Sequence, residues 1–309
     1  MGGGPNKDGM NFAQTYVLSA AASCIAESTT YPFDITKTRL QVAGEMSASG
    51  AGVKRGLVKT MAGIVQEEGI PQLYRGLAPA CLRHLVYSGI RVSAYEGLRE
   101  NVFQKNPDGS FPLWKGMMAG MMAGGIGQFL ATPTDLVKVQ MQIEGKRVAQ
   151  GGAPRFRGTL DAFRTIAKAG GIRGLYTGWQ PAVQRAMLVQ MGDLTTYDAA
   201  KQMFQREFGV ADGPALHAMS SGVAGLVAAT LGAPADVVKT RIMNQPLDEH
   251  GRGTLYKSTI DCLKKTVQNE GFGALYKGWL PTWMRMAPWS LTFFLSFEQL
   301  RRLSGMSSF

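Results

Sequence analysis

Three copies of one charged pattern offer the clearest chemistry in this sequence. In each copy a proline is followed two residues later by an aspartate and five residues later by a lysine. Acid and base three residues apart lie on one face of a helix, and the proline bends that helix. The copies begin 101 residues apart and contain Pro32, Asp34 and Lys37; Pro133, Asp135 and Lys138; and Pro234, Asp236 and Lys239.

A pattern repeated at a fixed period predicts a symmetric arrangement of three units. A single acid–base pair of this kind is usually an ordinary solvated helix end, but around a threefold axis the acid of one copy can reach the base of another. The predicted pairs are Asp34 with Lys138, Asp135 with Lys239, and Asp236 with Lys37. We expect this ring of ion pairs to close one end of a central cavity, and to open that end when the pairs break.

A second charged pattern ends each copy and consists of an aromatic residue, an acid, and a base three residues after the acid. Its members are Tyr95, Glu96 and Arg99; Tyr197, Asp198 and Lys201; and Phe297, Glu298 and Arg301. The cross-repeat pairs of this set would be Glu96 with Lys201, Asp198 with Arg301, and Glu298 with Arg99. Two rings at opposite ends predict two gates and therefore transport by alternating access.

An arginine stands 12 residues before the aromatic residue of each second pattern, at Arg83, Arg185 and Arg285. Twelve helical residues span ~18 Å, which places the three arginines between the two rings. Guanidinium groups bind carboxylate and phosphate well, so three of them at one depth predict a site for a small anion. The alternative is that they pair with internal acids and serve only the structure.

Two sets of positions break the threefold symmetry. Five residues before each proline stand Glu27, Gln128 and Ala229, and eight residues after each arginine stand Arg91, Asp193 and Phe293. Arg91 extends the predicted anion site. Glu27 and Asp193 are acids without an equivalent in the other copies, and we predict that they are linked to proton transfer, with a local salt bridge as the alternative.

Helices must position these residues. Segments of ~20 mainly small or apolar residues, enough to cross a membrane, lie at 12–31, 114–132 and 216–233, and at 77–95, 179–197 and 279–297. We therefore predict an all-α membrane protein with six transmembrane helices, pseudo-threefold symmetry, and three short helices in the basic connecting segments. The predicted organisation is a tail at 1–11 and repeats at 12–108, 109–212 and 213–309. A soluble helical repeat protein is the alternative interpretation, because charges interrupt several spans and the mean hydropathy is close to zero.

Composition narrows the function further. The net charge is +11, from 33 Lys+Arg against 22 Asp+Glu, which suits an anionic membrane surface or anionic substrates. Nucleic acid is not an expected partner, because no basic run alternates with stacking aromatic residues. The three histidines and three cysteines lack metal-ligand spacing, and no phosphate-binding loop follows the glycine-rich stretches, so we expect neither a metal nor an enzyme. We also expect no cleaved presequence and no myristoylation.

Taken together, the triplicated patterns resemble the mitochondrial carrier family over essentially the whole chain. The runs Cys24-Ile25-Ala26-Glu27 and Gly192-Asp193-Leu194-Thr195-Thr196-Tyr197-Asp198, with the three arginines, resemble its uncoupling-protein branch. The runs Val86-Tyr87-Ser88-Gly89 and Arg241-Ile242-Met243-Asn244-Gln245-Pro246 are most similar to the neural type, the fourth subtype of that branch.

The resemblance implies a monomeric, multi-pass carrier of the mitochondrial inner membrane with both termini toward the intermembrane space. The first ring would be the matrix gate, braced by Gln41 and Gln142, with Met243 at the third position. The second would be the cytosolic gate, braced by Tyr95 and Tyr197, with Phe297 at the third position. A missing brace at both rings predicts a modest barrier to opening.

The resemblance also implies ligands. Protons or small anions would be carried, purine nucleotides would inhibit, and fatty acids would activate. The three arginines and Arg91 would contact nucleotide phosphate or substrate, and Glu27 and Asp193 match proton-linked acids of the branch. Cardiolipin would bind as a structural lipid around Gly56, Gly76, Gly158, Gly178, Ser258 and Gly278.

Three functions are therefore weighed for this chain. The first is uncoupling-type transport of protons or small anions. Gly145-Lys146-Arg147 stands where the thermogenic relative has a histidine pair, which puts fatty-acid-driven uncoupling in doubt. The second is a dicarboxylate or phosphate exchanger that uses the same three arginines. The third, a degenerate carrier that acts as a receptor or scaffold, is disfavoured by the intact gates.

Overall fold

The structure is a computed structural model that describes residues 12–42, 56–104, 112–149, 151–209, 213–246 and 253–304. Every regular element within these ranges is helical. The long helices are α1 (Phe12–Gln41), α3 (Leu77–Asn101), α4 (Leu113–Ala149), α6 (Trp179–Phe208), α7 (Pro214–Asn244) and α9 (Trp279–Leu303). The short ones are α2 (Leu57–Glu68), α5 (Thr159–Leu175) and α8 (Thr259–Glu270), with 3₁₀ turns η1 (Ile70–Tyr74) and η2 (Phe272–Tyr276).

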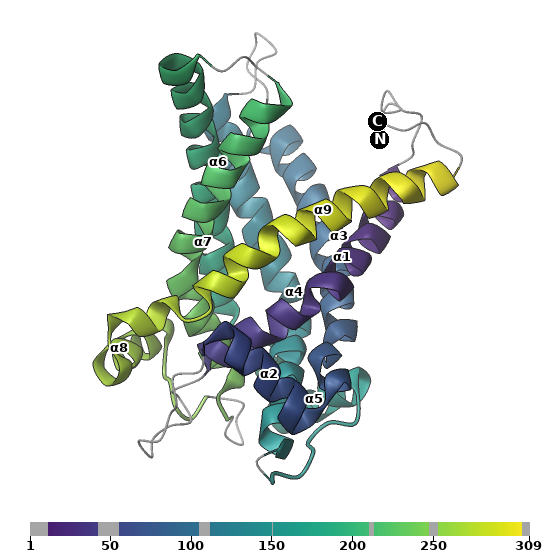
Figure 1. The fold of residues 1–309 in the computed structure, drawn as a ribbon, viewed down its shortest axis with the longest axis vertical. Helices are drawn as coiled ribbons and strands as arrows, with labels where there is room; N and C mark the ends of the chain where they lie inside the picture. The colour runs from purple at the N-terminus through teal and green to yellow at the C-terminus, as the bar shows by residue number, and fades with distance from the viewer. Residues whose placement is uncertain are drawn as a thin grey trace.

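The six long helices form a closed ring in chain order. α1 packs on α3, α3 on α4, α4 on α6, α6 on α7, α7 on α9, and α9 returns to α1. Figure 1 shows the last turns of α9 beside the first turns of α1. The first long helix of each repeat, α1, α4 or α7, also contacts the other two. These three helices therefore converge, and they carry the first charged pattern.

Each of the three converging helices contains the predicted proline, at Pro32, Pro133 and Pro234. A proline inside a helix removes one backbone hydrogen bond and bends the axis. The helical segment continues beyond each proline, so the Asp and Lys of the pattern sit on the segment after the bend. The bend explains how helices that belong to one ring can still meet at one end.

One glycine precedes the second long helix in each repeat. Gly76, Gly178 and Gly278 precede α3, α6 and α9 with φ values of 94°, 81° and 86°, a left-handed conformation that glycine adopts without strain. A Cβ on Gly178 would lie 2.8 Å from Met243 Cγ, and one on Gly278 would lie 3.1 Å from Gln41 Cγ. Glycine thus allows both a sharp turn and a close approach to the neighbouring repeat.

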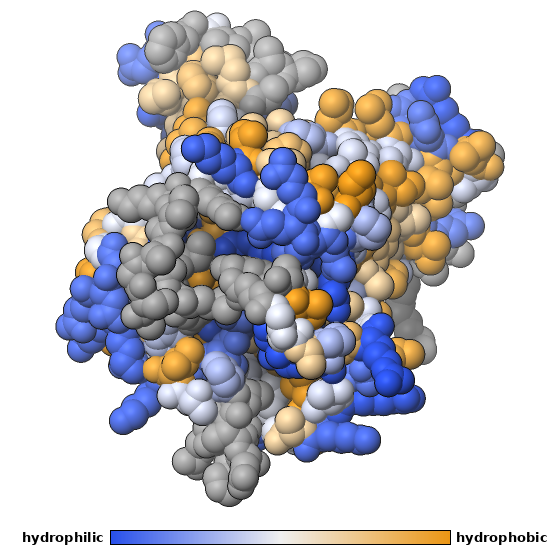
Figure 2. All heavy atoms as spheres, turned by 60° about the horizontal axis from the view of Figure 1, so that its bottom comes forward, coloured by the Kyte–Doolittle hydropathy of each residue, from blue (hydrophilic) through white to orange (hydrophobic). Residues whose placement is uncertain are grey.

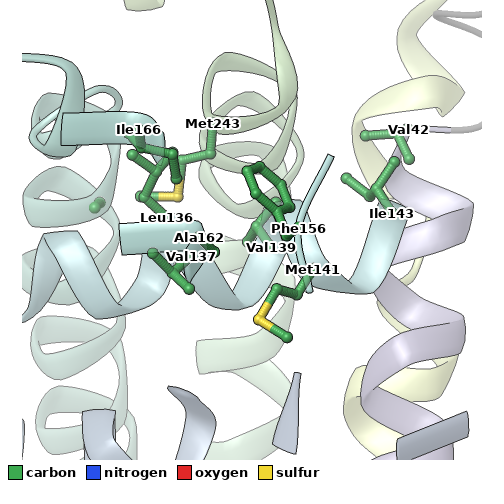
Figure 3. Close-up of a cluster of buried hydrophobic side chains, with 11 residues drawn as sticks. Val42, Leu136, Val137, Val139, Met141, Ile143, Phe156, Ala162, Ile166 and Met243 are labelled. Atoms are coloured by element: carbon green, nitrogen blue, oxygen red, sulfur yellow. The ribbon is translucent and has the colours of Figure 1, made fainter. Parts of the chain in front are cut away.

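The largest buried apolar cluster lies where a short helix packs beneath the converging ends. Figure 3 shows Leu136 and Val137 of α4 with Ala162 and Ile166 of α5, and Met243 of α7 close by. A second cluster joins Ile35 of α1 to Ile64 of α2. In Figure 1 the short helices α2, α5 and α8 lie at the lower end of the molecule. This packing holds the ends of α1 and α4 in place.

By length and hydropathy alone, one helix within the described residues, Met219–Asn244, is long and apolar enough to cross a membrane. One such helix is weak support for membrane insertion, and the six predicted spans are not recovered by this test. The charges that lower the hydropathy are turned inward, as with Glu27, which is 1% exposed. Conversely, Leu291, Phe294 and Leu295 of α9 are each more than half exposed.

The distribution of polar and apolar side chains therefore departs from that of a water-soluble protein. Figure 2 shows hydrophilic side chains gathered on the lower face of the molecule, and apolar side chains at the upper right of the view. An apolar exterior around a charged interior suits helices that face lipid and enclose a polar path.

Candidate functional site: an ion-pair ring with an arginine layer

A ring of three ion pairs links α1, α4 and α7. Lysine Nζ atoms lie 2.6–2.7 Å from aspartate oxygens in the pairs Lys138–Asp34, Lys239–Asp135 and Lys37–Asp236. All six side chains are at most 13% exposed. Each pair joins two repeats, and the three partnerships are the ones that the threefold argument predicts. The structure thus brings the three helices together at the end that carries the short helices.

Glutamines lie next to two of the three pairs. Gln142 Nε2 donates to Asp34 Oδ2 at 3.1 Å and to the Tyr31 hydroxyl at 3.0 Å, and Thr38 donates to its amide oxygen at 2.7 Å. In the same way Thr240 donates to the amide oxygen of Gln41 at 2.8 Å. These glutamines therefore tie neighbouring repeats together next to the ring.

The third pair has a different support. Met243 occupies the position four residues after Lys239, where the other repeats have glutamine, and its side chain is fully buried. Gln128 Nε2 of α4 instead donates to Asp135 Oδ2 at 2.6 Å. The Asp135 carboxylate thus receives an amide hydrogen bond from another position. Gln128 differs from its symmetry-related residues, but the sequence alone predicted no such contact.

All three predicted arginines point inward and contact acids of the ring. Arg83 Nε lies 2.7 Å from Asp135 Oδ1, and Arg185 Nε lies 2.5 Å from Asp236 Oδ1. Arg285 Nη1 lies 3.6 Å from Asp34 Oδ1. Each ring acid therefore has one lysine and one arginine as neighbours. The internal pairing that the sequence left open as an alternative is present, and the arginines form a layer beside the ring.

Glu27 is a fourth acid in this cluster. Its carboxylate lies 2.9 Å from Lys138 Nζ, 3.0 Å from Arg285 Nη1 and 3.2 Å from His84 Nε2. The local salt bridge that was the alternative for Glu27 is therefore formed. The His84 ring also stacks on Trp289 of α9, with ring centroids 6.1 Å apart. His84 is not among the residues predicted for the site, although its position next to Arg83 was a usable signal.

Arg91 and Asp193 lie apart from the ring. Both are exposed, and within the described ranges Asp193 has no ion-pair partner. Arg91 and Arg83 stand on the two sides of Tyr87, with guanidinium carbons 5.7 Å and 5.4 Å from the ring centroid. The spacing of these three residues places them on one face of α3. An anion moving along that face would meet Arg91 before Arg83.

The acids of the second charged pattern differ from those of the first in their ion pairs. In the described residues, Glu298 pairs with Arg302 one turn later in α9, and no ion pair links Glu96, Asp198 or Glu298 to a base in another repeat. The Tyr197 hydroxyl lies 2.5 Å from His217 Nδ1, and Phe297 is buried. Within the described part of the chain, the acids of the first pattern are therefore paired across repeats, whereas those of the second pattern are not.

Two arginine–glutamate pairs fasten short helices to the converging ends. Arg39 Nη2 lies 2.8 Å from Glu68 Oε2, and Arg241 Nη2 lies 3.0 Å from Glu270 Oε2. Burial alone would raise the pKa of Glu270, but hydrogen bonds from Arg241 and Lys277 outweigh that effect and lower it. The middle repeat has Gln140 and Gly170 at the corresponding positions. The middle repeat therefore has neither the arginine nor the glutamate of this pair.

Pockets lie at the predicted lipid positions, but they combine residues of different repeats. A pocket of about 380 Å³ is lined by Leu57 of α2 and by Gly278 and Trp279 at the start of α9. Another of about 330 Å³ is lined by Ser258 before α8 and by Trp179 of α6. Gly56 and Gly178 are the residues just before Leu57 and Trp179. Gly76 and Gly158 are the N-caps of α3 and α5, the helices that correspond to these by symmetry.

Among the described residues, no group of three or more His, Cys, Asp or Glu side chains is arranged to hold a metal ion. Cys24, Cys81 and Cys262 are not joined in disulfides.

Comparison with known proteins gives a consistent result. The family described as "Mitochondrial carrier protein" matches residues 8–106, 109–208 and 211–308. Mitochondrial uncoupling protein 3 of Arabidopsis thaliana is 43% identical over 295 residues, which cover 95% of each chain. Mitochondrial uncoupling protein 4C of Drosophila melanogaster is 38% identical over 301 residues, covering 97% of this chain and 90% of the relative.

A further relative, Kidney mitochondrial carrier protein 1 of Xenopus laevis, is 37% identical over 291 residues, covering 94% of this chain and 97% of the relative. The family model thus matches the chain three times in succession. The uncoupling-protein relatives carry several different subtype numbers, so the similarity to the fourth subtype stays a prediction.

Proposed function

Because this chain belongs to the mitochondrial carrier family, we propose that it is an uncoupling-type transporter of the mitochondrial inner membrane that moves protons or small anions by alternating access. The observation that carries the proposal is the ion-pair ring with an inward layer of three arginines. The ring would be the matrix gate, and the second charged pattern would be the cytosolic gate. Family membership supports a transporter rather than an enzyme.

The shared contacts of the ring acids provide a way to couple binding to opening. Asp135 is contacted by both Lys239 and Arg83, and Asp236 is contacted by both Lys37 and Arg185. An anion that binds the guanidinium groups competes with these carboxylates for the same donors. The ring acids would then keep only their lysines, and the closed state would lose stabilisation. A ligand shifts a two-state equilibrium in this way when it binds one state more tightly.

Closure of the other end completes the transport cycle. The pairs Glu96 with Lys201, Asp198 with Arg301, and Glu298 with Arg99 would form when the matrix ring opens. Before they join this cytosolic ring, Glu298 would have to leave Arg302, and Tyr197 would have to leave His217. We propose Glu27 and Asp193 as the groups linked to proton movement, with Arg91 at the entrance of the anion path.

Lipid and regulators belong to the same proposal. The two pockets between repeats each place the start of a helix near apolar wall residues, which suits a lipid phosphate with acyl chains. We propose cardiolipin for them, purine nucleotides as inhibitors at the arginine layer, and fatty acids as activators. We further propose that the carrier works as a monomer with both termini in the intermembrane space.

The proposal is tested with purified protein in cardiolipin-containing liposomes. Proton flux and uptake of labelled small anions are measured in the same vesicles for the natural protein and for Arg185→Ala. We expect the natural protein to transport, and Arg185→Ala to lose transport while keeping a cooperative thermal unfolding transition. A folded natural protein that moves neither protons nor anions contradicts the proposal, as does full transport by Arg185→Ala.

A further inference from the structure

Helices α1 and α3 of the first repeat run in opposite directions, and contacts between them fix their register. Where α3 begins, the Tyr31 hydroxyl donates to the Arg75 carbonyl oxygen at 3.0 Å. Toward the other end, the Tyr16 hydroxyl donates to the Leu85 carbonyl oxygen, and a Cβ on Gly89 would lie 3.0 Å from Tyr16 Cε2. Residue numbers thus fall along α1 as they rise along α3, and the two helices pack against each other.

Each of these two helices carries a cysteine between the contacts. Cys24 is eight residues after Tyr16, and Cys81 is eight residues before Gly89. Eight residues correspond to ~12 Å along a helix, so equal steps along antiparallel helices bring the two cysteines to the same level. Residues eight apart also lie on the same side of a helix, so each cysteine faces the other helix. The thiols of Cys24 and Cys81 are accordingly in hydrogen-bonding contact with each other.

The thiol pair lies one helical turn from a contact of the ion-pair cluster. Glu27 is three residues after Cys24, His84 is three residues after Cys81, and the Glu27 carboxylate lies 3.2 Å from His84 Nε2. Both cysteines of the pair are partly exposed, whereas Cys262 is buried in α8. The pair is therefore held in place from both helices and is open to a small reagent.

Disulfides join cysteines whose side chains face each other at short range, with Cβ atoms ~3.5–4.5 Å apart. Two thiols in contact between packed helices suit this requirement. We propose that Cys24 and Cys81 are a site of reversible oxidation, at which hydroperoxides form a disulfide that fastens α1 to α3 and holds the conformation with the ring of ion pairs closed. The formation of the disulfide does not depend on what the protein transports. Its effect on transport rests on the proposed function.

The oxidation proceeds in two steps. The sulfur of one cysteine attacks a hydroperoxide oxygen, the O–O bond breaks, and the thiol proton passes to the leaving oxygen. This step gives a sulfenic acid and an alcohol, or water in the case of hydrogen peroxide. The second sulfur then attacks the sulfenic sulfur, the S–O bond breaks, and the hydroxyl group leaves as water with the second thiol proton. The two thiols lose two electrons, and the hydroperoxide gains them.

Hydroperoxides suit the position of the pair. Cys24 and Cys81 lie in the segments 12–31 and 77–95, which are predicted to cross the membrane. A charged oxidant enters such a region only at a high cost in free energy, whereas hydrogen peroxide and lipid hydroperoxides have no charged oxidising group. The oxidant can therefore come from the water or from the bilayer, and both sources supply the same reacting O–O bond.

A bond between α1 and α3 should affect the ring because both helices contribute to it. Lys37 of α1 pairs with Asp236, and Arg83 of α3 pairs with Asp135. The two helices have their present arrangement while both pairs are formed. A disulfide at Cys24 preserves that arrangement, and so it should stabilise the closed ring relative to any conformation in which α1 and α3 move apart.

The test uses full-length protein, purified under reducing conditions and reconstituted in cardiolipin-containing liposomes. Cys262→Ser removes the third cysteine of the sequence, keeps the pair, and is the matched control. Cys24→Ser and Cys81→Ser, each combined with Cys262→Ser, keep one sulfur of the pair. One set of liposomes receives hydrogen peroxide in the buffer, and another contains phosphatidylcholine hydroperoxide in the bilayer, so the two sources of oxidant are compared.

Three measurements follow oxidation. Remaining thiols are blocked with N-ethylmaleimide, and mass spectrometry of a protease digest identifies peptides joined through Cys24 and Cys81. We expect these peptides, and a higher thermal unfolding midpoint, in the natural protein and in the control Cys262→Ser alone. Proton or anion transport by these two proteins should fall about tenfold, because a cross-link commonly contributes more than the ~1.4 kcal/mol that a tenfold change requires. Dithiothreitol should reverse all three effects.

The outcomes separate this inference from the proposed function. Natural protein that yields no joined peptides with either oxidant overturns the inference and leaves the function intact. An equal fall in transport in Cys24→Ser and Cys81→Ser also overturns it, because oxidation then acts elsewhere. Joined peptides without a change in unfolding midpoint or transport overturn the effect on the ring. If the reduced natural protein does not transport, the proposed function fails, while joined peptides with a higher unfolding midpoint still support the oxidation site. Alanine replaces serine in any variant that does not fold.

Discussion

At the scale of single residues, the ring shows how one repeat can differ from its neighbours without leaving a carboxylate unsupported. Gln142 donates to Asp34 from the position four residues after Lys138, while Gln128 donates to Asp135 from a position before the proline. Hydrogen bonds to a charged group contribute ~1.5–3 kcal/mol, so the exchange of one donor for another preserves much of the stabilisation. Asp135 therefore still receives an amide hydrogen bond although position 243 holds methionine. No glutamine side chain at that position links α7 to a neighbouring repeat.

This reasoning leads to a prediction for Met243→Gln. The new amide should join α7 to a neighbouring repeat, as Gln41 and Gln142 do, and stabilise the closed ring. We expect slower transport and a higher midpoint of thermal unfolding, measured in liposomes and in detergent. Met243→Leu, which keeps the site apolar, is the control and should leave both quantities nearly unchanged. An unchanged transport rate in Met243→Gln would count against a bracing role.

At the scale of elements, the short helices differ in how they are attached. α2 and α8 each end in a glutamate that binds an arginine of the converging helix, while α5 lacks such a pair and packs through Ala162 and Ile166 instead. The attachments of α2 and α8 therefore depend on charge, whereas the attachment of α5 depends on apolar contact. The attachment of α8 should therefore respond to pH, because the pKa of Glu270 is lowered in the folded protein.

The sign of this pH dependence follows from the direction of the shift. A glutamate whose folded pKa lies below the unfolded value of ~4.3 stabilises the folded state above that value, and this contribution disappears as the pH falls through the folded pKa. We expect Glu270→Gln to lower the thermal unfolding midpoint at pH 7. The difference from the natural protein should narrow as the pH approaches 3.

Thermal unfolding in detergent at a series of pH values measures this effect. Asp161→Asn is a useful comparison, because Asp161 lies on α5 and is not part of an arginine–glutamate pair between helices. A difference between Glu270→Gln and the natural protein that stays constant from pH 7 to pH 3 would show that the pair does not stabilise α8 by its charge.

At the scale of the whole molecule, ion pairs between repeats hold one end of the structure, while within the described residues the acids Glu96, Asp198 and Glu298 form no such pair at the other end. The ring joins all three repeats, whereas Glu298 of the second pattern is paired within its own helix. A carrier with both rings formed could not admit a substrate, so the asymmetry fits one state of an alternating-access cycle. Residues on opposite sides of the ring should therefore be accessible from different sides of the membrane.

Cysteine labelling tests this view of the molecule. In a protein whose Cys24, Cys81 and Cys262 are replaced by serine, Asp193→Cys should react with a membrane-impermeant maleimide added on the side of the second charged pattern, because Asp193 is exposed. Gln142→Cys, fully buried beside the ring, should react slowly from that side. Equal labelling of Asp193→Cys from both sides of the membrane would contradict the closed ring.

Much of this arrangement could be read from the residues alone. The period of 101 residues places Asp34, Asp135 and Asp236 at equivalent positions, and only one cyclic order then brings each acid to the base that it contacts. The helical rise likewise places each arginine between the two charged patterns. These features depend on the order of residues along the chain and on symmetry, which a sequence contains in full.

Only the tertiary structure decided which ring is closed, how deep the arginines lie, and which neighbours fill the asymmetric positions. The contacts of Glu27 with His84, and of Gln128 with Asp135, depend on the tilt of helices and on side-chain rotamers. The pockets between α2 and α9 and between α6 and α8 likewise depend on how repeats meet. Such contacts join residues far apart in the chain, so their geometry follows from packing and not from local spacing.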